Sequence, residues 1–389
     1  MFKERKIEPD DIKTIEDLRR IPILDKDDVR KHFEELIALN AKDYKYGAGS
    51  TSGSTGKPVA FCLDQQNREM EYASKWRQRE WAQVGLNDRI ATYRAFRALR
   101  GTNYQSGKPR WKFNALSKEL EFNIFGLNKA MLKPQVKKLR EFCPKLIEGY
   151  PSTIELLAKY VLDQNIKGIS PVAIQTSSES LSTRRAVIEE AFHCKVYDRY
   201  GHSEYVVSAS ECPEGSYHVG ESGIMEFIKD GEQVSHEEVG EIVGTGLYNY
   251  SMPLIRYRTT DLGRYSKETC RCKRGLPIVQ SLEGRVSDSI LAIDGRVITG
   301  NVFENYWKNV INPLTPNLDY VHVVQRSDQR LLIRLVKKEG FSNEELLAVV
   351  NGLKALLGSE IQIEFEELDS APIQRKWRFT ESELNVGLI

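Results

Sequence analysis

A stretch of glycine, serine, threonine and lysine at residues 46–58 constrains the fold more than any other part of the chain. It reads Tyr-Gly-Ala-Gly-Ser-Thr-Ser-Gly-Ser-Thr-Gly-Lys-Pro and offers a core almost no apolar side chain. Glycines let backbone N–H groups turn toward an anion, hydroxyl groups add donors, and a lysine adds charge. Because an apolar strand follows directly, we predict an ordered phosphate-binding loop rather than the flexible linker that this composition also fits.

The loop does not match a Walker A motif, which needs Gly-x-x-x-x-Gly-Lys followed by serine or threonine. Thr51 stands where the first glycine should be, and Pro58 replaces the hydroxyl residue that would bind magnesium. The sequence therefore predicts a phosphate loop outside the P-loop NTPases.

Bulk properties narrow the class of protein. A length of 389 residues exceeds one ordinary core and predicts two or three domains. The chain is 40% hydrophobic and 29% charged, without an apolar run of membrane-span length. Its net charge of +1 gives no reason to expect a nucleic-acid or membrane partner, and leaves a monomer and a homodimer open. The charged N-terminus and the sparse cysteines lead us to expect a cytoplasmic protein without disulfides.

Local patterns predict an α/β fold. Alternating periodicities favour the following helices and strands: helices over 11–18, 25–36, 64–84, 152–162 and 182–192, and strands over 58–63, 171–176 and 195–198. Ser152 and Glu155 have the spacing of a capping box at the start of the fourth helix. Strands and hairpins dominate 217–248, where Asp230-Gly231 fits a tight turn.

The last hundred residues predict a separate small unit. Strands over 321–324, 331–336 and 361–365 flank a helix that Ser342 and Glu345 open and Gly358 ends. We therefore expect a large multi-layer α/β N-terminal domain and a small α+β C-terminal domain. The predicted boundaries are 1–286, with a β-rich subdomain near 205–284, and 287–389.

Three other polar stretches can share a site with the glycine-rich loop. Residues 198–204 place Glu204 past a strand end, where ligands of α/β sheets bind. Residues 256–264 place Asp261 in a polar turn, where a carboxylate can accept both ribose hydroxyls of a nucleotide. Residues 283–298 look like a junction into the small domain. Glu204 also fits an ordinary surface carboxylate, and Asp261 a turn cap.

A basic stretch over 89–118 has two interpretations. It fits a solvated loop, and it fits a landing site for a phosphate-bearing or acidic second substrate.

In their order and spread, these stretches resemble the adenylate-forming ligase superfamily of acyl-CoA synthetases and peptide-synthetase adenylation domains. The leader over 12–27 and the run over 148–152 resemble its phenylacetate–CoA ligase-like branch, which includes capsular-polysaccharide biosynthesis members. The resemblance implies an ATP-dependent enzyme that activates a carboxylic acid as an acyl-adenylate. The acceptor would be coenzyme A or an amine of a sugar or amino acid. The small domain would rotate between half-reactions, so 287–389 should be mobile.

The resemblance also implies roles for individual residues. The outer phosphates of ATP would be bound by Ser50, Thr51, Ser52, Gly53, Ser54, Thr55, Gly56 and Lys57. Glu204 would bind Mg²⁺, and Asp261 would bind the ribose with Arg285 beside it. The adenine and acyl pockets would involve Tyr150, Ser178, Glu179, Tyr200, Gly201 and His202. His202 fits a loop-filling position equally well, and Arg285 a salt bridge at the junction.

The chain departs from the family pattern near its C-terminus. Ser287, followed by Asp288, stands where the family often has an aspartate or lysine. Arg375 replaces the glycine before the family's C-terminal lysine. Lys376 is therefore our candidate for the lysine that would bridge carboxylate and phosphate, with a surface lysine as the alternative. Members of the branch usually begin with further helical residues, so we expect an unusual acyl pocket. These departures keep open a nucleotide-binding protein that has lost catalysis.

Cysteine and histidine spacing predicts a metal site. Cys212 and His218 are separated by five residues, and Cys270 and Cys272 by one. Three cysteines and one histidine are a closed tetrahedral set that suits structural Zn²⁺, with separate thiols as the alternative. The branch often shows such a set in this region. The other cysteines are expected in the core: Cys62, Cys143 and Cys194.

Overall fold

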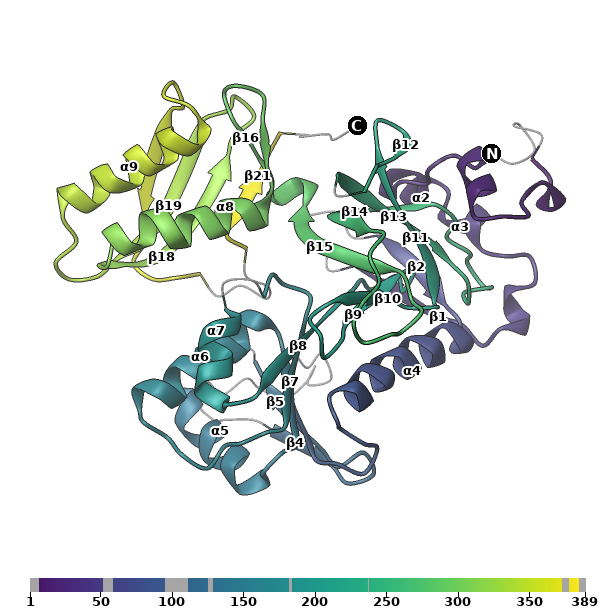
Figure 1. The fold of residues 1–389 in the computed structure, drawn as a ribbon, viewed down its shortest axis with the longest axis horizontal. Coiled ribbons are helices and arrows are strands. Elements are labelled where there is room, and N and C mark those ends of the chain that lie inside the picture. The colour runs from purple at the N-terminus through teal and green to yellow at the C-terminus, as the bar shows by residue number, and fades with distance from the viewer. Residues whose placement is uncertain are drawn as a thin grey trace. The chain divides into compact units, whose positions relative to one another are not determined.

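The chain divides into two units, each made of segments far apart in sequence. The computed structural model describes residues 7–51, 59–94, 111–124, 129–181, 184–236, 238–372 and 378–384. The first unit comprises Met1–Trp81, Arg199–Leu282 and Leu388–Ile389, and the second comprises Ala82–Asp198 and Glu283–Gly387. The elements are mixed α/β, as the sequence predicts (Figure 1).

The first unit begins with short helices: η1 (Pro9–Asp11), η2 (Glu16–Arg20), α2 (Lys26–Lys31), α3 (Phe33–Leu36) and η3 (Ala41–Asp43). The predicted helix over 11–18 is wrong in extent, since only a 3₁₀ segment forms there. The predicted helix over 25–36 is interrupted at His32. Asp25 caps α2 by accepting hydrogen bonds from two backbone N–H groups of its first turn.

The glycine-rich stretch is enclosed by a hairpin. Its strands are β1 (Gly47–Ser50) and β2 (Ala60–Leu63), and helix α4 (Gln65–Trp81) follows. Gly49 is required here, because a Cβ atom at this position would lie 2.4 Å from the ring of Phe61 on the paired strand. The predicted strand and long helix are both confirmed.

A largely antiparallel sheet builds the rest of this unit. Its strands are β9 (Ser208–Glu211), β10 (Tyr217–Val219), β11 (Gly223–Lys229), β12 (Glu232–Gln233), β13 (Val239–Gly246), β14 (Tyr257–Ser266) and β15 (Ile278–Arg285, which ends in the second unit). Their order is β12-β11-β13-β14-β15-β10-β9. Asp230 (φ 52°) and Gly231 (φ 80°) form the predicted tight turn. Val59, Phe61 and Ile242 belong to its buried apolar core.

The second unit begins with a mostly parallel sheet. Its strands are β3 (Ile90–Arg94), β4 (Trp111–Asn114), β5 (Glu119–Asn123), β6 (Leu146–Gly149), β7 (Ala173–Ser177) and β8 (Lys195–Gly201, which runs on into the first unit), in the order β8-β7-β6-β3-β5-β4. Helices α5 (Lys129–Phe142), α6 (Pro151–Asp163) and α7 (Arg185–Phe192) connect them, and their apolar faces share one core with the strands. The predicted alternation of helix and strand is confirmed over 152–198.

The start of α6 corrects a local prediction. Tyr150 is the N-cap residue and Pro151 is the first helical residue, so Ser152 does not form a capping box with Glu155. The N–H of Ser152 instead donates to Oε2 of Glu179 at 2.9 Å, from the chain just past β7.

The C-terminal part of the second unit has its own core. Strands β18 (Leu318–Gln325), β19 (Leu331–Lys337), β20 (Ile363–Glu367) and β21 (Thr380–Ser382) are ordered β20-β19-β18-β21. Figure 1 shows α8 (Gly300–Tyr306) and α9 (Asn343–Leu357) along this sheet. The predicted capping box of α9 is confirmed, since the Glu345 N–H donates to Ser342 Oγ and the Ser342 N–H to Glu345 Oε2. Gly358 ends the helix with φ 112°.

Several short elements precede and connect these helices and strands. They are η4 (Val286–Asp288), the pair β16 (Ile290–Leu291) and β17 (Val297–Ile298), a π-helical turn (Trp307–Ile311) and η6 (Asn312–Leu314). The buried residues of this core all lie between Ile290 and Ile361.

Two further observations bear on the sequence predictions. Cys62 is buried, but Cys143 is exposed at the C-terminus of α5 with a left-handed backbone, so its assignment to the core is wrong. Among the described residues, no helix is long and apolar enough to cross a membrane.

Candidate active site

The base of the glycine-rich loop is fixed by hydrogen bonds between its two ends. The N–H of Thr51 donates to the carbonyl of Val59, and the N–H of Val59 donates to Oγ1 of Thr51, both at 2.9 Å. Ser50 pairs with Ala60 in the hairpin. The predicted phosphate ligands Ser52, Gly53, Ser54, Thr55, Gly56 and Lys57 lie outside the described residues.

Glu204 is a buried, ionised carboxylate just past β8. Its side chain is 5% exposed, its Oε1 accepts a hydrogen bond from the Tyr257 hydroxyl at 2.7 Å, and its Oε2 lies 3.4 Å from Nδ1 of His202. Burial by itself would raise the pKa of Glu204. The interactions with His202, the Tyr257 hydroxyl and the charge of Lys26 outweigh burial and hold that pKa at about 2. Glu204 is therefore not an ordinary surface carboxylate.

Asp261 has a matching arrangement on β14. It is 8% exposed, and its Oδ2 accepts a hydrogen bond from the Tyr200 hydroxyl at 2.8 Å. Its backbone N–H donates to Oγ1 of Thr259 at 3.1 Å. The predicted polar turn is wrong, because Asp261 lies inside β14, where groups from β8 and β14 hold it. Gly201, the last residue of β8, pairs with Ser208 on the neighbouring strand.

Two residues of this cluster were not among the sequence-predicted site residues. Tyr257 lies in the polar stretch that carries Asp261, and Lys26 lies in the N-terminal leader. Lys26 Nζ donates to the Thr259 carbonyl and to Thr260 Oγ1, each at 2.8 Å. In the sequence, Tyr257 and Lys26 are marked only by their residue types within these two stretches. Because their hydrogen-bond partners are distant in sequence, local patterns could not predict the contacts.

The cluster has the chemistry of a cation and polyol site. Ionised carboxylate oxygens are the ligands that Mg²⁺ prefers, and a carboxylate can accept two hydrogen bonds from adjacent hydroxyls. Tyr200, Glu204, Tyr257 and Asp261 come from two strands and the loop after one of them, all in the first unit. The structure therefore brings together the residues predicted for Mg²⁺ and for ribose.

The remaining predicted residues belong to the second unit. Tyr150 and Ser178 follow the carboxyl ends of the adjacent parallel strands β6 and β7, and Ser178 is left-handed with φ 74°. Glu179 joins these two strand ends through its bond to Ser152. Arg285 ends β15, and its carbonyl accepts a hydrogen bond from Ser289 Oγ at 3.0 Å. Lys376 lies outside the described residues.

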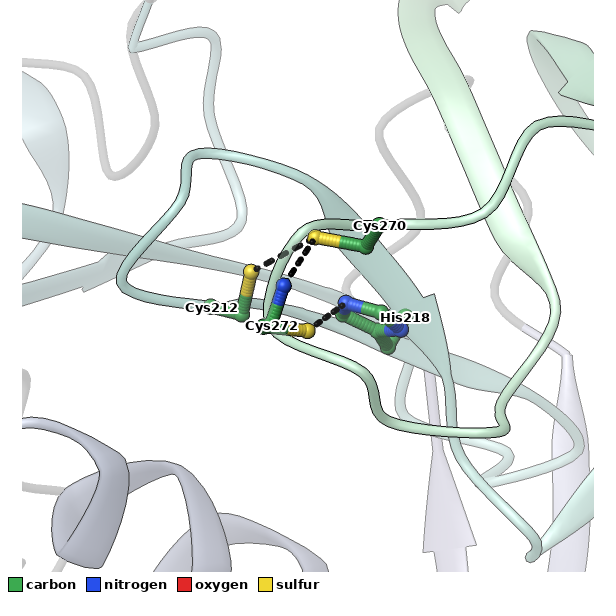
Figure 2. Close-up of side chains that lie close together, drawn as sticks. All are labelled: Cys212, His218, Cys270 and Cys272. Carbon is green, nitrogen blue, oxygen red and sulfur yellow. Dashed lines mark hydrogen bonds between the residues drawn. The ribbon is translucent and has the colours of Figure 1, made fainter.

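The four predicted metal ligands converge in the first unit (Figure 2). Cys212 follows β9, His218 lies on β10, and Cys270 and Cys272 lie in the turn between β14 and β15. The Cys212 and Cys270 sulfur atoms are 3.6 Å apart, and the Cys272 sulfur is 3.2 Å from His218 Nε2. All four ligand atoms lie within 4.8 Å of one another.

These distances fit a tetrahedral ion. Zn–S bonds of about 2.3 Å and Zn–N bonds of about 2.0 Å place tetrahedral ligand atoms roughly 3.5 Å apart. Burial raises the pKa of Cys212 to about 11. At Cys272, burial is outweighed by donors from Arg274 and the neighbouring thiols, which lower the pKa to about 7. The ring of Trp81 lies edge-on to His218, and Arg274 stacks on Trp81. The separate-thiol alternative does not explain this convergence.

Known proteins are similar to this chain in sequence. No family model matches the chain. Protein CapK of Staphylococcus aureus is 26% identical over 377 residues, which cover 92% of this chain and 78% of CapK. A phenylacetate–coenzyme A ligase of Thermus thermophilus is 25% identical, covering 75% of this chain and 66% of the ligase. The corresponding ligase of Pseudomonas putida is 27% identical, with 76% and 66% covered.

Solved structures share the fold. A 2-hydroxyisobutyryl-CoA ligase in the post-adenylation state aligns over 99% of this chain and 85% of the ligase, with a TM-score of 0.74 and 18% identity. ATP-bound MatB from Rhodopseudomonas palustris aligns over 86% and 66%, with a TM-score of 0.56 and 14% identity. The chain is thus similar in sequence to CapK and the phenylacetate–coenzyme A ligases, and it shares the fold of adenylate-forming CoA ligases.

Proposed function

We propose that the protein uses ATP to activate a carboxylic acid as an acyl-adenylate and transfers the acyl group to coenzyme A. The observation that carries the proposal is the pair of buried carboxylates, Glu204 and Asp261, each hydrogen-bonded by a tyrosine hydroxyl. The phenylacetate–coenzyme A ligases among its relatives support the same reaction class.

The predicted site residues would each bind or stabilise a different charged group of the reaction. A carboxylate oxygen of the acid attacks the α-phosphorus of ATP, the bond from that phosphorus to the bridging oxygen breaks, and pyrophosphate leaves. Ser50–Lys57 would hold the outer phosphates and Asp261 the ribose hydroxyls. Glu204 would hold Mg²⁺, which would reduce repulsion between the two anions. Lys376 and Arg285 would stabilise charge on the α-phosphoryl group. The thiol of coenzyme A then attacks the acyl carbon, and AMP leaves.

Residues of the second unit would contribute to the adenine and acyl pockets. Tyr150, Ser178 and Glu179 would contact adenine and the acyl group, since they gather past the carboxyl ends of β6 and β7. Tyr200 and Gly201 end β8 and His202 follows it, and these residues of the first unit would also contact adenine or the acyl group.

An amine acceptor is our second proposal. It rests on the resemblance of the sequence to the capsular-polysaccharide members of the branch. An amide-forming ligase that joins the acyl group to an amine of a sugar or amino acid would share the adenylation step. It would differ only in the nucleophile that attacks the adenylate.

ATP–pyrophosphate exchange tests the shared step. Purified protein is incubated with ATP, Mg²⁺, labelled pyrophosphate and one acid at a time from aryl, hydroxy and short aliphatic classes. We expect exchange with at least one class. Measurable ATP binding with no exchange for any acid would favour the catalytically inactive nucleotide-binding alternative. With an active acid, consumption of coenzyme A thiol against formation of an amide with added amines separates the two acceptors.

We also propose that the Cys/His cluster binds structural Zn²⁺. Four protein ligands fill a tetrahedral shell and leave no position for substrate, so the ion would clip the β9–β10 turn to the β14–β15 turn. Elemental analysis of protein purified without chelator is expected to find one Zn²⁺ per chain. Protein that is folded, active and free of zinc would contradict the assignment.

The division into domains is a further proposal. Residues 287–389 would form a mobile C-terminal domain, and 1–286 would form the N-terminal domain with its β-rich part near 205–284. The separate core over 290–361 supports this division. Limited proteolysis is expected to cut near 286–290 faster without ligand than with ATP and acid. Equal cleavage rates would contradict the mobility.

A further inference from the structure

Lys26 joins the N-terminal helices to the strand that carries Asp261. Its Nζ atom donates to the carbonyl of Thr259 and to Oγ1 of Thr260, each at 2.8 Å. These partners lie 233 and 234 residues further along the chain. A lysine at the first position of α2 thus contacts the two residues immediately before Asp261.

Backbone hydrogen bonds fix the position from which Lys26 reaches. The N–H of Leu24 donates to the carbonyl of Arg256, and the N–H of Arg258 donates to the carbonyl of Leu24, both at 2.9 Å. Leu24 therefore runs beside β14 as a short parallel bridge. Asp25 then caps α2 and starts the helix at Lys26. The contact of Lys26 is thus part of a built junction, not a chance surface approach.

Thr260 has a backbone conformation that its side chain disfavours. Its φ is 69°, and a β-branched residue in the left-handed region is strained. Such a residue persists only where its surroundings hold it. Thr259 is tied to the sheet, since its Oγ1 donates to the Ile242 carbonyl at 2.7 Å. The same Oγ1 accepts a hydrogen bond from the N–H of Asp261, so hydrogen bonds fix the chain on both sides of Thr260, in an irregular part of β14.

We propose that Lys26 is a positioning residue for the ribose site. Its two hydrogen bonds hold the strained backbone at Thr260, and this irregular part of β14 keeps the Asp261 carboxylate oriented beside the Tyr200 hydroxyl. This inference rests on the proposed nucleotide-binding role of Asp261. A direct contact between Lys26 and the nucleotide is the competing explanation, because the lysine charge also acts on Glu204.

Substitution of Lys26 and Thr260 together separates these explanations. Lys26→Met removes the donors and the charge while keeping the length of the side chain. We expect it to raise KM for ATP about tenfold, the loss expected for charge-assisted hydrogen bonds, with kcat and KM for the acid changed less than twofold. Adding Thr260→Gly should restore KM for ATP to within about twofold of wild type, because glycine adopts this backbone conformation without strain. Lys31→Met, an exposed lysine of the same helix, is the matched control and should leave KM unchanged.

The double variant decides the mechanism. A KM for ATP that stays as high as in Lys26→Met would overturn the positioning role and favour direct contact with the nucleotide. An unchanged KM in Lys26→Met would overturn any role for the lysine. A fall in kcat for both substrates together with a lower melting temperature would assign it a merely structural role.

A second measurement does not depend on catalysis. Amide hydrogen exchange over 257–263 should be faster in Lys26→Met, because the Thr259–Asp261 hydrogen bond loosens, and slow again in the double variant. If the wild type forms no adenylate with any acid, the proposed function fails. The same exchange pattern would still support the positioning role of Lys26. Unchanged amide hydrogen exchange in Lys26→Met would overturn the positioning role of Lys26, even in an active enzyme.

Discussion

Two clusters of buried side chains in the first unit hold their polar atoms in different ways. Glu204 and Asp261 each accept a short hydrogen bond from a tyrosine, and the pKa of Glu204 stays near 2 despite burial. In the Cys/His cluster the closest partners are other ligand atoms, and burial raises the pKa of Cys212 to about 11. Protein groups hold the pKa of Glu204 low despite its burial, whereas at Cys212 burial prevails and the proposed Zn²⁺ would stabilise the thiolate.

The largest expected effect comes from removing the proposed zinc. Apparent binding energies of structural zinc are on the order of 10 kcal/mol, and they contribute to folding. Chelation, or Cys212→Ser, is therefore expected to lower the free energy of unfolding by roughly 5 kcal/mol or more, measured by urea unfolding. Re-added Zn²⁺ should restore the chelated wild type but not the variant.

The exposed Cys143 provides the control for this experiment. Cys143→Ser should change the free energy of unfolding by less than about 0.5 kcal/mol, because an exposed thiol makes few packing contacts. If Cys212→Ser changed the free energy of unfolding equally little, the cluster would not depend on a bound ion. The proposed difference between the Cys/His cluster and the carboxylates would then be contradicted.

The next effect concerns the charge of Glu204. Glu204→Gln keeps an acceptor for the Tyr257 hydroxyl but removes the negative charge proposed to hold Mg²⁺. We expect kcat for adenylation to fall by roughly 10²–10³, the loss seen when one preorganised electrostatic group is removed. Pyrophosphate exchange at increasing Mg²⁺ measures this loss, and high Mg²⁺ should recover part of the rate.

An exposed glutamate elsewhere in the first unit serves for comparison. Glu232→Gln, exposed on β12, should keep wild-type exchange. Wild-type exchange in Glu204→Gln would show that its buried charge serves the fold and not the reaction.

Local chemistry predicted much of the fold. The Asp230-Gly231 turn and the Ser342–Glu345 capping box were correct, since each depends only on residues within a few positions. The Ser152–Glu155 cap was wrong, because Pro151 starts the helix and Glu179, from the next strand, bonds the Ser152 N–H. Cys143 was placed in the core on residue type alone, although a helix C-terminus with a left-handed residue exposes it.

For the candidate sites, the sequence likewise predicted individual residues but not their contacts. Spacing predicted that Cys212, His218, Cys270 and Cys272 would lie together, and their ligand atoms lie within 4.8 Å of one another. Resemblance singled out Glu204, Asp261 and Tyr200, but neither Tyr257 nor the hydrogen bonds that the two tyrosines donate. The partners in these bonds lie 53 and 61 residues apart in sequence and meet only in the folded sheet.

A smaller effect is expected from the hydroxyl of Tyr200. Tyr200→Phe removes one hydrogen bond to a carboxylate, which is worth about 1–2 kcal/mol. KM for ATP is expected to rise roughly fivefold to tenfold, with KM for the acid changed less. Tyr265→Phe, on the same strand as Asp261, is the matched control and should keep wild-type values. An equal effect from both substitutions would contradict a specific role for Tyr200.

The smallest effect is a dependence of stability on pH. The pKa of Glu204 is about 2 in the folded chain, below the ordinary value of 4.5, so its ionised form stabilises the fold. This contribution is complete above about pH 4.5 and is lost as the pH falls toward 2. Glu204→Gln should thus be less stable than wild type at pH 6, and the gap in urea midpoint should narrow between pH 4.5 and 3. A gap that stays constant over this range would mean that the hydrogen bonds do not hold the charge of Glu204, which would then resemble Cys212, whose ionised form is disfavoured by burial.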